Sequence, residues 1–262
     1  MILRDFNRMI RFVVLILVFA ITNCGNARNE EDSLNIVNNS FRVKSVVLPT
    51  IMIVSGGILS YTNFRKWPTE KLQYVNNGHR TDCDNYIQFT PHLIYTIGGE
   101  LGLASKSSLV KRSMSLVNSS VLSFGVSRLI KHYTWEDRPG NSGTNSFPSG
   151  HTATAFTGAE LARLEYGATV GIVSYCLASM VGILRLSNNK HWINDVIAGA
   201  GIGILSARIG VYITELEYKF LSKIFCHKNK SKKNKKVTNI LIIPHSGDNN
   251  ESGICLGLYV TL

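Results

Sequence analysis

Three short segments of the sequence combine cationic, hydroxyl and histidine side chains at defined spacings. They are 131–139 (KHYTWEDRP), 148–151 (PSGH) and 185–195 (RLSNNKHWIND). Arginine can hold a phosphate through two parallel hydrogen bonds, and lysine adds a compact positive charge. The three segments together predict a site for a phosphate-bearing anion.

The segment 148–151 has the composition of a helix start that binds an anion. Pro148 suits the first helical turn, Ser149 is a good N-cap residue, and Gly150 lets a backbone approach a ligand closely. Free N–H groups at a helix N-terminus favour an anion. His151 adds a group that can give or take a proton near neutral pH. The alternative interpretation is a capped helix start with an incidental histidine.

The third segment contains a histidine and a carboxylate that share a helix face. His191 and Asp195 are four residues apart, so the carboxylate can hold one ring nitrogen and leave the other as a nucleophile or base. His151 is then free to act as an acid. The plainer alternative is an ion pair at a helix start. With the nearby cations, the arrangement predicts phosphoryl transfer without a metal ion.

The cations have a simpler explanation when each is taken alone. Lys131 and Arg138 could be juxtamembrane positive charges, and Arg185 could extend its head group to a membrane surface. Their neighbours are interpreted as interface anchors or as solvated charges: Trp135, Glu136, Asp137, Lys190 and Trp192.

At these positions the sequence resembles the type 2 phosphatidic acid phosphatase superfamily, which includes membrane lipid phosphatases, bacterial acid phosphatases and vanadium haloperoxidases. The resemblance lies in Lys131 with six residues before Arg138-Pro139, in the PSGH segment, and in Arg185 with five residues before His191. Three more residues separate that histidine from Asp195. The similarity covers residues 125–210.

The resemblance implies a role for each matching residue. His191 would attack phosphorus and form a phosphohistidine, Asp195 would orient it, and His151 would protonate the leaving oxygen and then activate water. No cofactor is implied, and the sequence offers no carboxylate and histidine cluster with metal-ligand spacing. Leu184 stands where the family usually has serine, which we expect to weaken the site without abolishing it. The residues implied to bind the phosphoryl oxygens are Lys131, Arg138, Ser149, Gly150 and Arg185.

The elements that must position these residues are apolar. Several are shorter than the roughly 20 residues of a transmembrane helix, but their glycine, serine and alanine suit close packing in a membrane. We therefore predict an all-α fold, a multi-helix transmembrane bundle of about six helices. The candidate segments are 46–60, 92–105, 113–130, 152–165, 168–187 and 193–214.

The charge distribution predicts how the bundle is oriented. The net charge is +11, and seven lysines lie in 223–236. This tract fits a cytoplasmic tail beside anionic lipid better than a nucleic-acid interface, because no aromatic platform accompanies it. Counting back from it places 106–112 inside and the three motif segments outside. We expect a multi-pass inner-membrane protein with its active site facing the periplasm and no nucleic-acid partner.

The predicted domains are a signal peptide (1–27), a membrane phosphatase domain (28–222) and a basic tract with a tail (223–262). Within the tail, 240–243 and 254–262 are predicted as short strands. Five scattered cysteines predict neither a zinc site nor a disulfide framework.

The segment 46–60 conflicts with this topology if the signal peptide is cleaved. A single crossing there would leave 62–91 on the wrong side. Either the signal run is not translocated, or 46–60 lies in the membrane interface, where Pro49 and the pair Gly56-Gly57 would break it.

The stretches 145–156 (NSFPSGHTATAF) and 188–205 (NNKHWINDVIAGAGIGIL) are also similar to bacterial phosphatases that include lipid A 4′-phosphatases, more loosely than the motifs are to the superfamily. We therefore predict a phosphorylated membrane lipid as substrate: lipid A first, with the 4′-phosphate ahead of the 1-phosphate. Undecaprenyl diphosphate is the second candidate, with phosphatidylglycerol phosphate among the other lipid phosphates. An alternative of another class is a non-catalytic component that binds or transports lipid, although the complete set of motif residues speaks against it.

Overall fold

The computed structural model describes residues 43–75, 81–140, 143–230, 239–246 and 252–259. The chain divides into two units, Met1–Tyr218 and Lys219–Leu262. The predicted signal peptide lies outside the described residues, as does the part of the basic tract from residue 231 onward.

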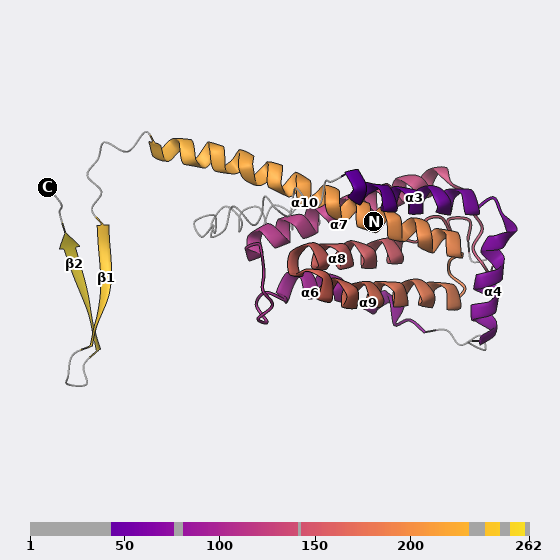
Figure 1. The fold of residues 1–262 in the computed structure, drawn as a ribbon, viewed down its shortest axis with the longest axis horizontal. Helices are drawn as coiled ribbons and strands as arrows, with labels where there is room; N and C mark the ends of the chain where they lie inside the picture. Colours follow the sequence, from indigo (N-terminus) through magenta and orange to yellow (C-terminus); the bar gives the residue numbers. More distant parts are fainter. Residues whose placement is uncertain (1–42, 76–80, 141–142, 231–238, 247–251, 260–262) are drawn as a thin grey trace. The chain divides into compact units, whose positions relative to one another are not determined.

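The first unit is a bundle of α-helices (Figure 1). Its described residues form no β-strand, and the predicted all-α class is confirmed. A 3-10 turn, η2 (Asn63–Arg65), precedes α4, and α10 extends past Tyr218, the last residue of the first unit. In chain order the helices are α3 (Val43–Leu59), α4 (Lys66–Val75), α5 (Asp84–Ile87), α6 (Thr90–Ile97), α7 (Leu109–Tyr133), α8 (Gly150–Tyr166), α9 (Ala168–Ser187) and α10 (Ile193–Lys230).

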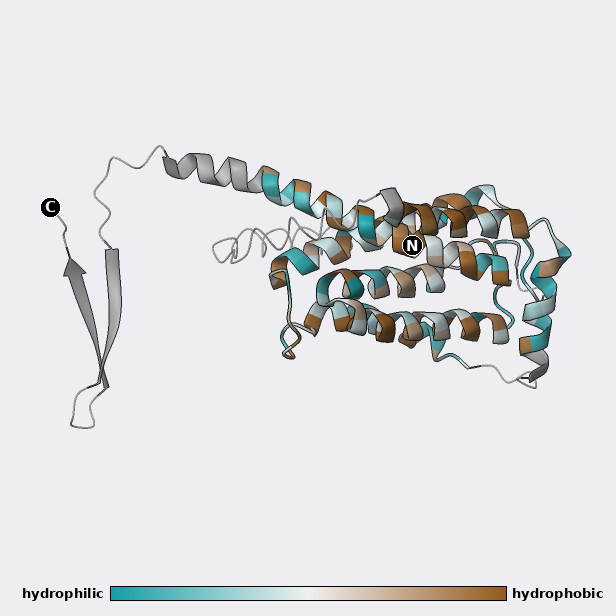
Figure 2. Cartoon of the chain, in the orientation of Figure 1, coloured by the Kyte–Doolittle hydropathy of each residue, from teal (hydrophilic) through white to brown (hydrophobic). Residues whose placement is uncertain are grey.

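Two of the helices are long and apolar enough to cross a bilayer. They are Ala168–Ser187 and Ile193–Phe220, and the bent pair Ser45–Leu59 with Asn63–Leu72 could form a third span. Figure 2 shows apolar residues along α3 and α9, and many of these side chains are exposed on the bundle surface. These helices mark a membrane protein, whose outer face is apolar because it meets lipid rather than water.

The predicted helix over 92–105 is wrong in its second half. Helix α6 ends at Ile97, and the following residues turn back toward the bundle. Gly99 donates its N–H to Tyr166 Oη at 2.9 Å, and Gly102 has a φ of +95°, which favours glycine. The region 62–91, which lies between two of the predicted apolar segments, contains η2, α4 and α5.

The predicted break within 46–60 is also wrong. Helix α3 runs through Pro49 without interruption, and the chain bends by 102° only after Leu59. A Cβ atom on Gly56 would lie 2.7 Å from Ala198 Cβ, and one on Gly201 would lie 2.6 Å from the Pro49 carbonyl oxygen. The glycines therefore serve close packing between α3 and α10.

Glycines also bring α10 against α8, and this contact sets the site. A Cβ atom on Gly199 would lie 2.5 Å from Ser149 O, and one on Gly203 would lie 2.4 Å from Ala153 O. Small residues four apart let two helix backbones approach closely. The start of α10 is thereby held beside the start of α8.

The second unit contains a β-hairpin. Strand β1 (Asn239–Ser246) pairs antiparallel with β2 (Ser252–Tyr259), with Asn239 opposite Tyr259. The strands predicted in the tail are confirmed as far as residue 259, where the described residues end.

Candidate functional site

A cavity of about 460 Å³ lies where α7 and α9 end and α8 begins. The three motif segments meet there, although the 33 residues of 152–184 separate the second segment from the third. Ser149 and Asp195, two other predicted site residues, are fully buried, and the Ser149 N–H donates to the Asp195 carbonyl oxygen at 3.0 Å. The predicted residues that line the cavity are Lys131, Arg138, Gly150, His151, Arg185 and His191.

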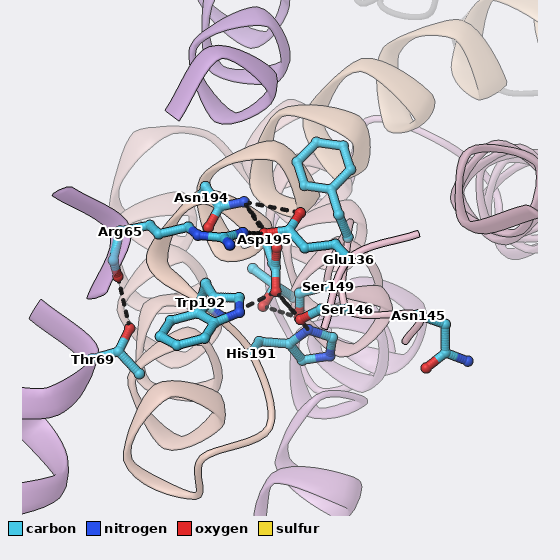
Figure 3. Close-up of polar contacts among 12 residues, drawn as sticks. Arg65, Thr69, Glu136, Asn145, Ser146, Ser149, His191, Trp192, Asn194 and Asp195 are labelled. Atoms are coloured by element: carbon cyan, nitrogen blue, oxygen red, sulfur yellow. Dashed lines mark hydrogen bonds and ion pairs between the residues drawn. The ribbon is translucent and has the colours of Figure 1, made fainter. Parts of the chain in front are cut away.

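His191 and Asp195 form a buried pair at the start of α10. The distance between His191 Nδ1 and Asp195 Oδ2 is 3.1 Å. The same oxygen accepts the Trp192 N–H at 2.9 Å and the Ser146 hydroxyl, while Oδ1 accepts Asn194 Nδ2 at 3.1 Å (Figure 3). With an ionised carboxylate as acceptor, Nδ1 carries the proton and Nε2 keeps its lone pair.

The local chain path explains why this pair forms. Helix α9 ends in a turn in which Asn189 has a φ of +60°, and Lys190 N donates to Arg185 O at 3.1 Å. The chain then enters α10, where Asp195 caps the N–H of Trp192. A carboxylate in the first turn of a helix is stabilised by the free N–H groups and the dipole there.

His191 is only 2% exposed and lies among cations. Burial, followed by the positive charge of Arg185, lowers its pKa well below the ordinary value of 6.5. The imidazole is therefore neutral at physiological pH, the state that a nucleophilic nitrogen requires.

His151 lies in the first turn of α8, and its Nε2 is 2.8 Å from Asn85 Oδ1 on α5. Burial, followed by the charge of Arg185, lowers the pKa of His151 to about 4. Negative charge entering the cavity would raise this pKa again, because it would favour the imidazolium form.

The three predicted cations are held in different ways. Arg185 Nη1 donates to Asp84 Oδ2 at 2.5 Å, and Lys131 Nζ donates to the carbonyl oxygens of Asn145 and Ser146 at 2.8 and 3.1 Å. The buried Nε atoms of Arg138 and Arg185 have no hydrogen-bond partner within the part of the chain that the structure describes. These unused donors make the cavity suited to an oxyanion.

The two predicted phosphate-binding residues at the start of α8, Ser149 and Gly150, have different relations to the cavity. A Cβ atom on Gly150 would meet no atom within 4 Å and would project into open space. The Ser149 hydroxyl is paired with Thr152 Oγ1 at 2.9 Å and does not line the cavity. Gly150 therefore leaves room for a ligand, while Ser149 fastens the first turn of α8.

Glu136 was expected to be a solvated loop charge, and this is wrong. Its side chain is 10% exposed, forms an ion pair with Arg65 and accepts Asn194 Nδ2 at 3.1 Å (Figure 3). Burial, followed by the charge of Asp195, raises the pKa of Glu136 to about 7. Through Asn194 this carboxyl group is connected to Asp195.

Trp192 also does more than the predicted interface anchoring. Its Nε1 donates to Asp137 O at 2.7 Å, and the Arg65 guanidinium lies 5.2 Å from its ring centroid. Trp135, by contrast, is 86% exposed. The partners Arg65, Asp84 and Asn85 come from outside the three motifs, where the sequence carries no signal for them.

The residues of the described segments include no group of three histidine, cysteine, aspartate or glutamate side chains placed to hold a metal ion. The donors around the cavity are cations and N–H groups, which suit an anion rather than a metal.

Comparisons with known proteins agree with the site's chemistry. A lipid A 1-phosphatase of Porphyromonas gingivalis is 32% identical over 185 residues, which cover 68% of this chain and 40% of the relative. The chain thus spans about two fifths of that protein.

Two solved structures resemble the fold more distantly. Aquifex aeolicus LpxE is 24% identical with a TM-score of 0.39, covering 54% of this chain and 93% of its own. A Bacillus subtilis PAP2-type phosphatidylglycerolphosphate phosphatase is 21% identical with a TM-score of 0.44, covering 72% of this chain and 99% of its own.

The family described as the PAP2 superfamily matches residues 112–219, a range that contains all eight predicted site residues. Residues 112–219 therefore form a PAP2-superfamily domain.

Proposed function

We propose that the protein is a metal-independent phosphatase that removes a phosphate group from a membrane lipid, with lipid A as the first candidate. The observation that carries the proposal is the buried His191–Asp195 pair facing a cavity lined by Lys131, Arg138 and Arg185. The apolar helices place this polar site within a membrane protein, and a lipid phosphate is the anion such a protein meets there.

In the proposed first step, His191 Nε2 attacks phosphorus, a P–N bond forms and the P–O bond to the lipid breaks. Asp195 accepts the Nδ1–H and stabilises the positive charge that develops on the ring. Lys131, Arg138 and Arg185 stabilise the charge that gathers on the phosphoryl oxygens. Because these cations are already in position, little reorganisation is needed as the reaction proceeds.

His151 serves as the proton donor and then as the base. The pKa of about 4 in the ligand-free site rises when the phosphate brings its negative charge, so the ring can carry a proton to the leaving oxygen. In the second step His151 takes a proton from water, the new P–O bond forms and the P–N bond breaks. Inorganic phosphate leaves and His191 is restored.

The phosphate position within lipid A is open to direct test. The sequence motifs favoured the 4′-phosphate, whereas the Porphyromonas gingivalis relative is named for the 1-phosphate, and that name supports the 1-position. Mass spectrometry of lipid A from cells with and without the gene should show loss of one phosphate only when the gene is present. Purified protein should release phosphate from lipid A, and His191→Ala should not. Unchanged lipid A together with release from undecaprenyl diphosphate would redirect the proposal to that substrate.

We further propose that the cavity faces the periplasm. In a cysteine-free background, a thiol introduced by Thr144→Cys should react with an impermeant reagent in intact spheroplasts, and one introduced by Ser231→Cys should react only after lysis. The basic tract that begins before residue 231 supports this orientation. Reaction of both positions from the same side would contradict it.

A further inference from the structure

The cavity is larger than one phosphoryl group requires. Its volume of about 460 Å³ falls in the range of pockets that enclose whole small molecules, roughly 300–1,000 Å³. Helix α7 lines it from Ser123 to Lys131, which corresponds to about 12 Å of helix at about 1.5 Å per residue. The phosphate-binding residues account for only one part of this length. We call the remainder the distal part, lined by Gln88, Ser123, Phe124, Ser127, Arg128 and Thr154.

The distal part contains the buried hydroxyl group of Ser127. Ser127 is 5% exposed, and its Oγ has no hydrogen-bond partner among the residues that the structure describes. A serine within a helix commonly donates to a carbonyl of the preceding turn, as Ser113 does to Leu109 O at 2.9 Å. Leaving a buried hydroxyl unpaired costs free energy. Ser127 therefore offers a donor to a ligand in the cavity.

Arg128 is also distinguished by its surroundings. Its guanidinium lies 5.2 Å from the Phe124 ring centroid, and no carboxylate of the described segments is within ion-pair distance. Arg138 likewise has no carboxylate of the described segments within ion-pair distance, and both arginines line the cavity. The other arginines of the described residues each pair with a carboxylate: Arg65, Arg112, Arg163, Arg185 and Arg208.

Position along α7 connects these two residues to the phosphate site. Ser127 lies four residues before Lys131, so both project from the same helix face into the cavity. Arg128 follows directly, one turn away from Lys131. A group bound by Arg128 would thus lie beside a phosphate held by Lys131, within reach of the same head group.

We propose that Arg128 and Ser127 form a second anion subsite, which binds another negatively charged group of the same lipid head group, such as a second phosphate. A guanidinium can grip a phosphate through two parallel hydrogen bonds, and the Ser127 hydroxyl adds a third donor. The inference rests on the proposed function and specifies its substrate class: lipids whose head groups carry two anionic groups.

The test compares two lipids with the same acyl chains, one with a single phosphate on its head group and one with two. The full chain is assayed in detergent micelles as wild type, Arg128→Gln and Ser127→Ala. Lys66→Gln is the charge-matched control, since Lys66 is exposed on α4 and does not line the cavity. Arg128→Gln should raise KM for the two-phosphate lipid about tenfold or more, the loss expected of a charge-assisted hydrogen bond.

The pattern across the two lipids decides the outcome. Arg128→Gln should leave kcat on both lipids and KM for the single-phosphate lipid nearly unchanged, and Ser127→Ala should raise KM for the two-phosphate lipid about two- to tenfold. An arginine that merely contacts the bilayer surface would change KM for both lipids alike, and that result would overturn the subsite. So would an unchanged KM for the two-phosphate lipid in Arg128→Gln.

Failure of the proposed phosphatase function gives a different result from failure of the subsite. If wild type releases phosphate from neither lipid, the phosphatase proposal fails, and equilibrium binding of the two-phosphate lipid still tests the subsite. Wild type should then bind that lipid about tenfold or more tightly than Arg128→Gln does. Equal binding by the two proteins would remove the subsite as well.

Discussion

His191 Nδ1 and Asp195 Oδ2 lie 3.1 Å apart between two buried side chains, and Ser146, Trp192 and Asn194 donate to the same carboxylate. A carboxylate that accepts this many hydrogen bonds is fixed in orientation, and it fixes the ring in turn. The ring then presents Nε2 to the cavity in one tautomer.

The first prediction concerns Asp195→Asn, which removes the carboxylate that accepts the His191 Nδ1–H but keeps the shape of the side chain. Asp195→Asn can no longer accept the Nδ1–H as a carboxylate does, so the favoured tautomer places the proton on Nε2. We expect kcat to fall about 10⁴-fold, as it does when the carboxylate that orients a catalytic histidine is replaced by an amide. Folding is followed by size-exclusion chromatography in detergent. Activity within tenfold of wild type would show that Asp195 does not set the tautomer.

The second prediction concerns metal ions. The cavity already contains Lys131, Arg138 and Arg185 to neutralise phosphoryl charge, so a divalent cation has no electrostatic role left to fill. We expect the initial rate of phosphate release to be unchanged in excess chelator. A complete loss that is reversed by adding one divalent metal would contradict the metal-independent mechanism.

The sequence could predict features that are marked within one segment, but it could not predict contacts between segments that are distant in sequence. The helices carrying the motifs follow from apolar runs, and the cavity follows from three motifs that share one end of the bundle. The ion pairs of Arg65 with Glu136 and of Arg185 with Asp84 bridge distant segments. Nothing local marks such partners, because only the packed helices bring them together.

Glycines were the other source of wrong predictions about helix bounds, because a single sequence does not show which neighbouring element lies opposite each glycine. Gly56 was expected to break a helix, yet it lies against Ala198 of α10. Gly98 was expected to continue a helix, yet the chain turns there. Glycine permits both close packing and a chain turn, and the neighbouring element decides between them.

The third prediction follows from the pKa of Glu136, which is raised from 4.5 to about 7. Because the folded protein holds this proton more tightly than the unfolded chain does, folding takes up a proton between these values. The stability that protonated Glu136 contributes is present below pH 4.5 and is lost as pH rises through 7.

Glu136→Gln stays neutral and should remove this dependence. We expect the thermal midpoint of the variant, relative to wild type, to rise as pH is raised from about 5 to 7.5. Thermal unfolding of both proteins in the same detergent and buffers gives the difference directly. A difference that is constant over this range would mean that Glu136 is ionised throughout.

The fourth prediction tests the glycine contact that places α10 beside α8. Gly199→Ala would put a Cβ atom 2.5 Å from Ser149 O, so the two helix starts must move apart. We expect lower thermal stability, by about 1–3 kcal/mol as for other overpacked sites, and reduced kcat because His191 and His151 lose their alignment. Gly125→Ala is the matched control, since no atom lies within 4 Å of a Cβ there. Equal effects of the two substitutions would show that the contact does not position the site.

The last prediction separates the two histidines. His151 should matter only when the leaving oxygen needs a proton, so His151→Ala should lose about 10²–10⁴-fold on a lipid or sugar phosphate and much less on nitrophenyl phosphate. His191→Ala should be inactive on both, because no phosphohistidine can form without the nucleophile. Asn85 provides a further check, because its Oδ1 lies 2.8 Å from His151 Nε2.

Asn85→Asp would place a negative charge beside His151 and raise its pKa from about 4, by about one unit or more. The alkaline limb of kcat/KM on the sugar phosphate, where the general acid loses its proton, should move upward by the same amount. Asn85→Ala removes the contact without adding charge, so it should not shift the limb in that direction.

The acid role of His151 would be excluded if His151→Ala lost as much activity on nitrophenyl phosphate as on the sugar phosphate. Covalent label trapped from substrate at alkaline pH should be found on His191, and label on His151 would reverse the assignment.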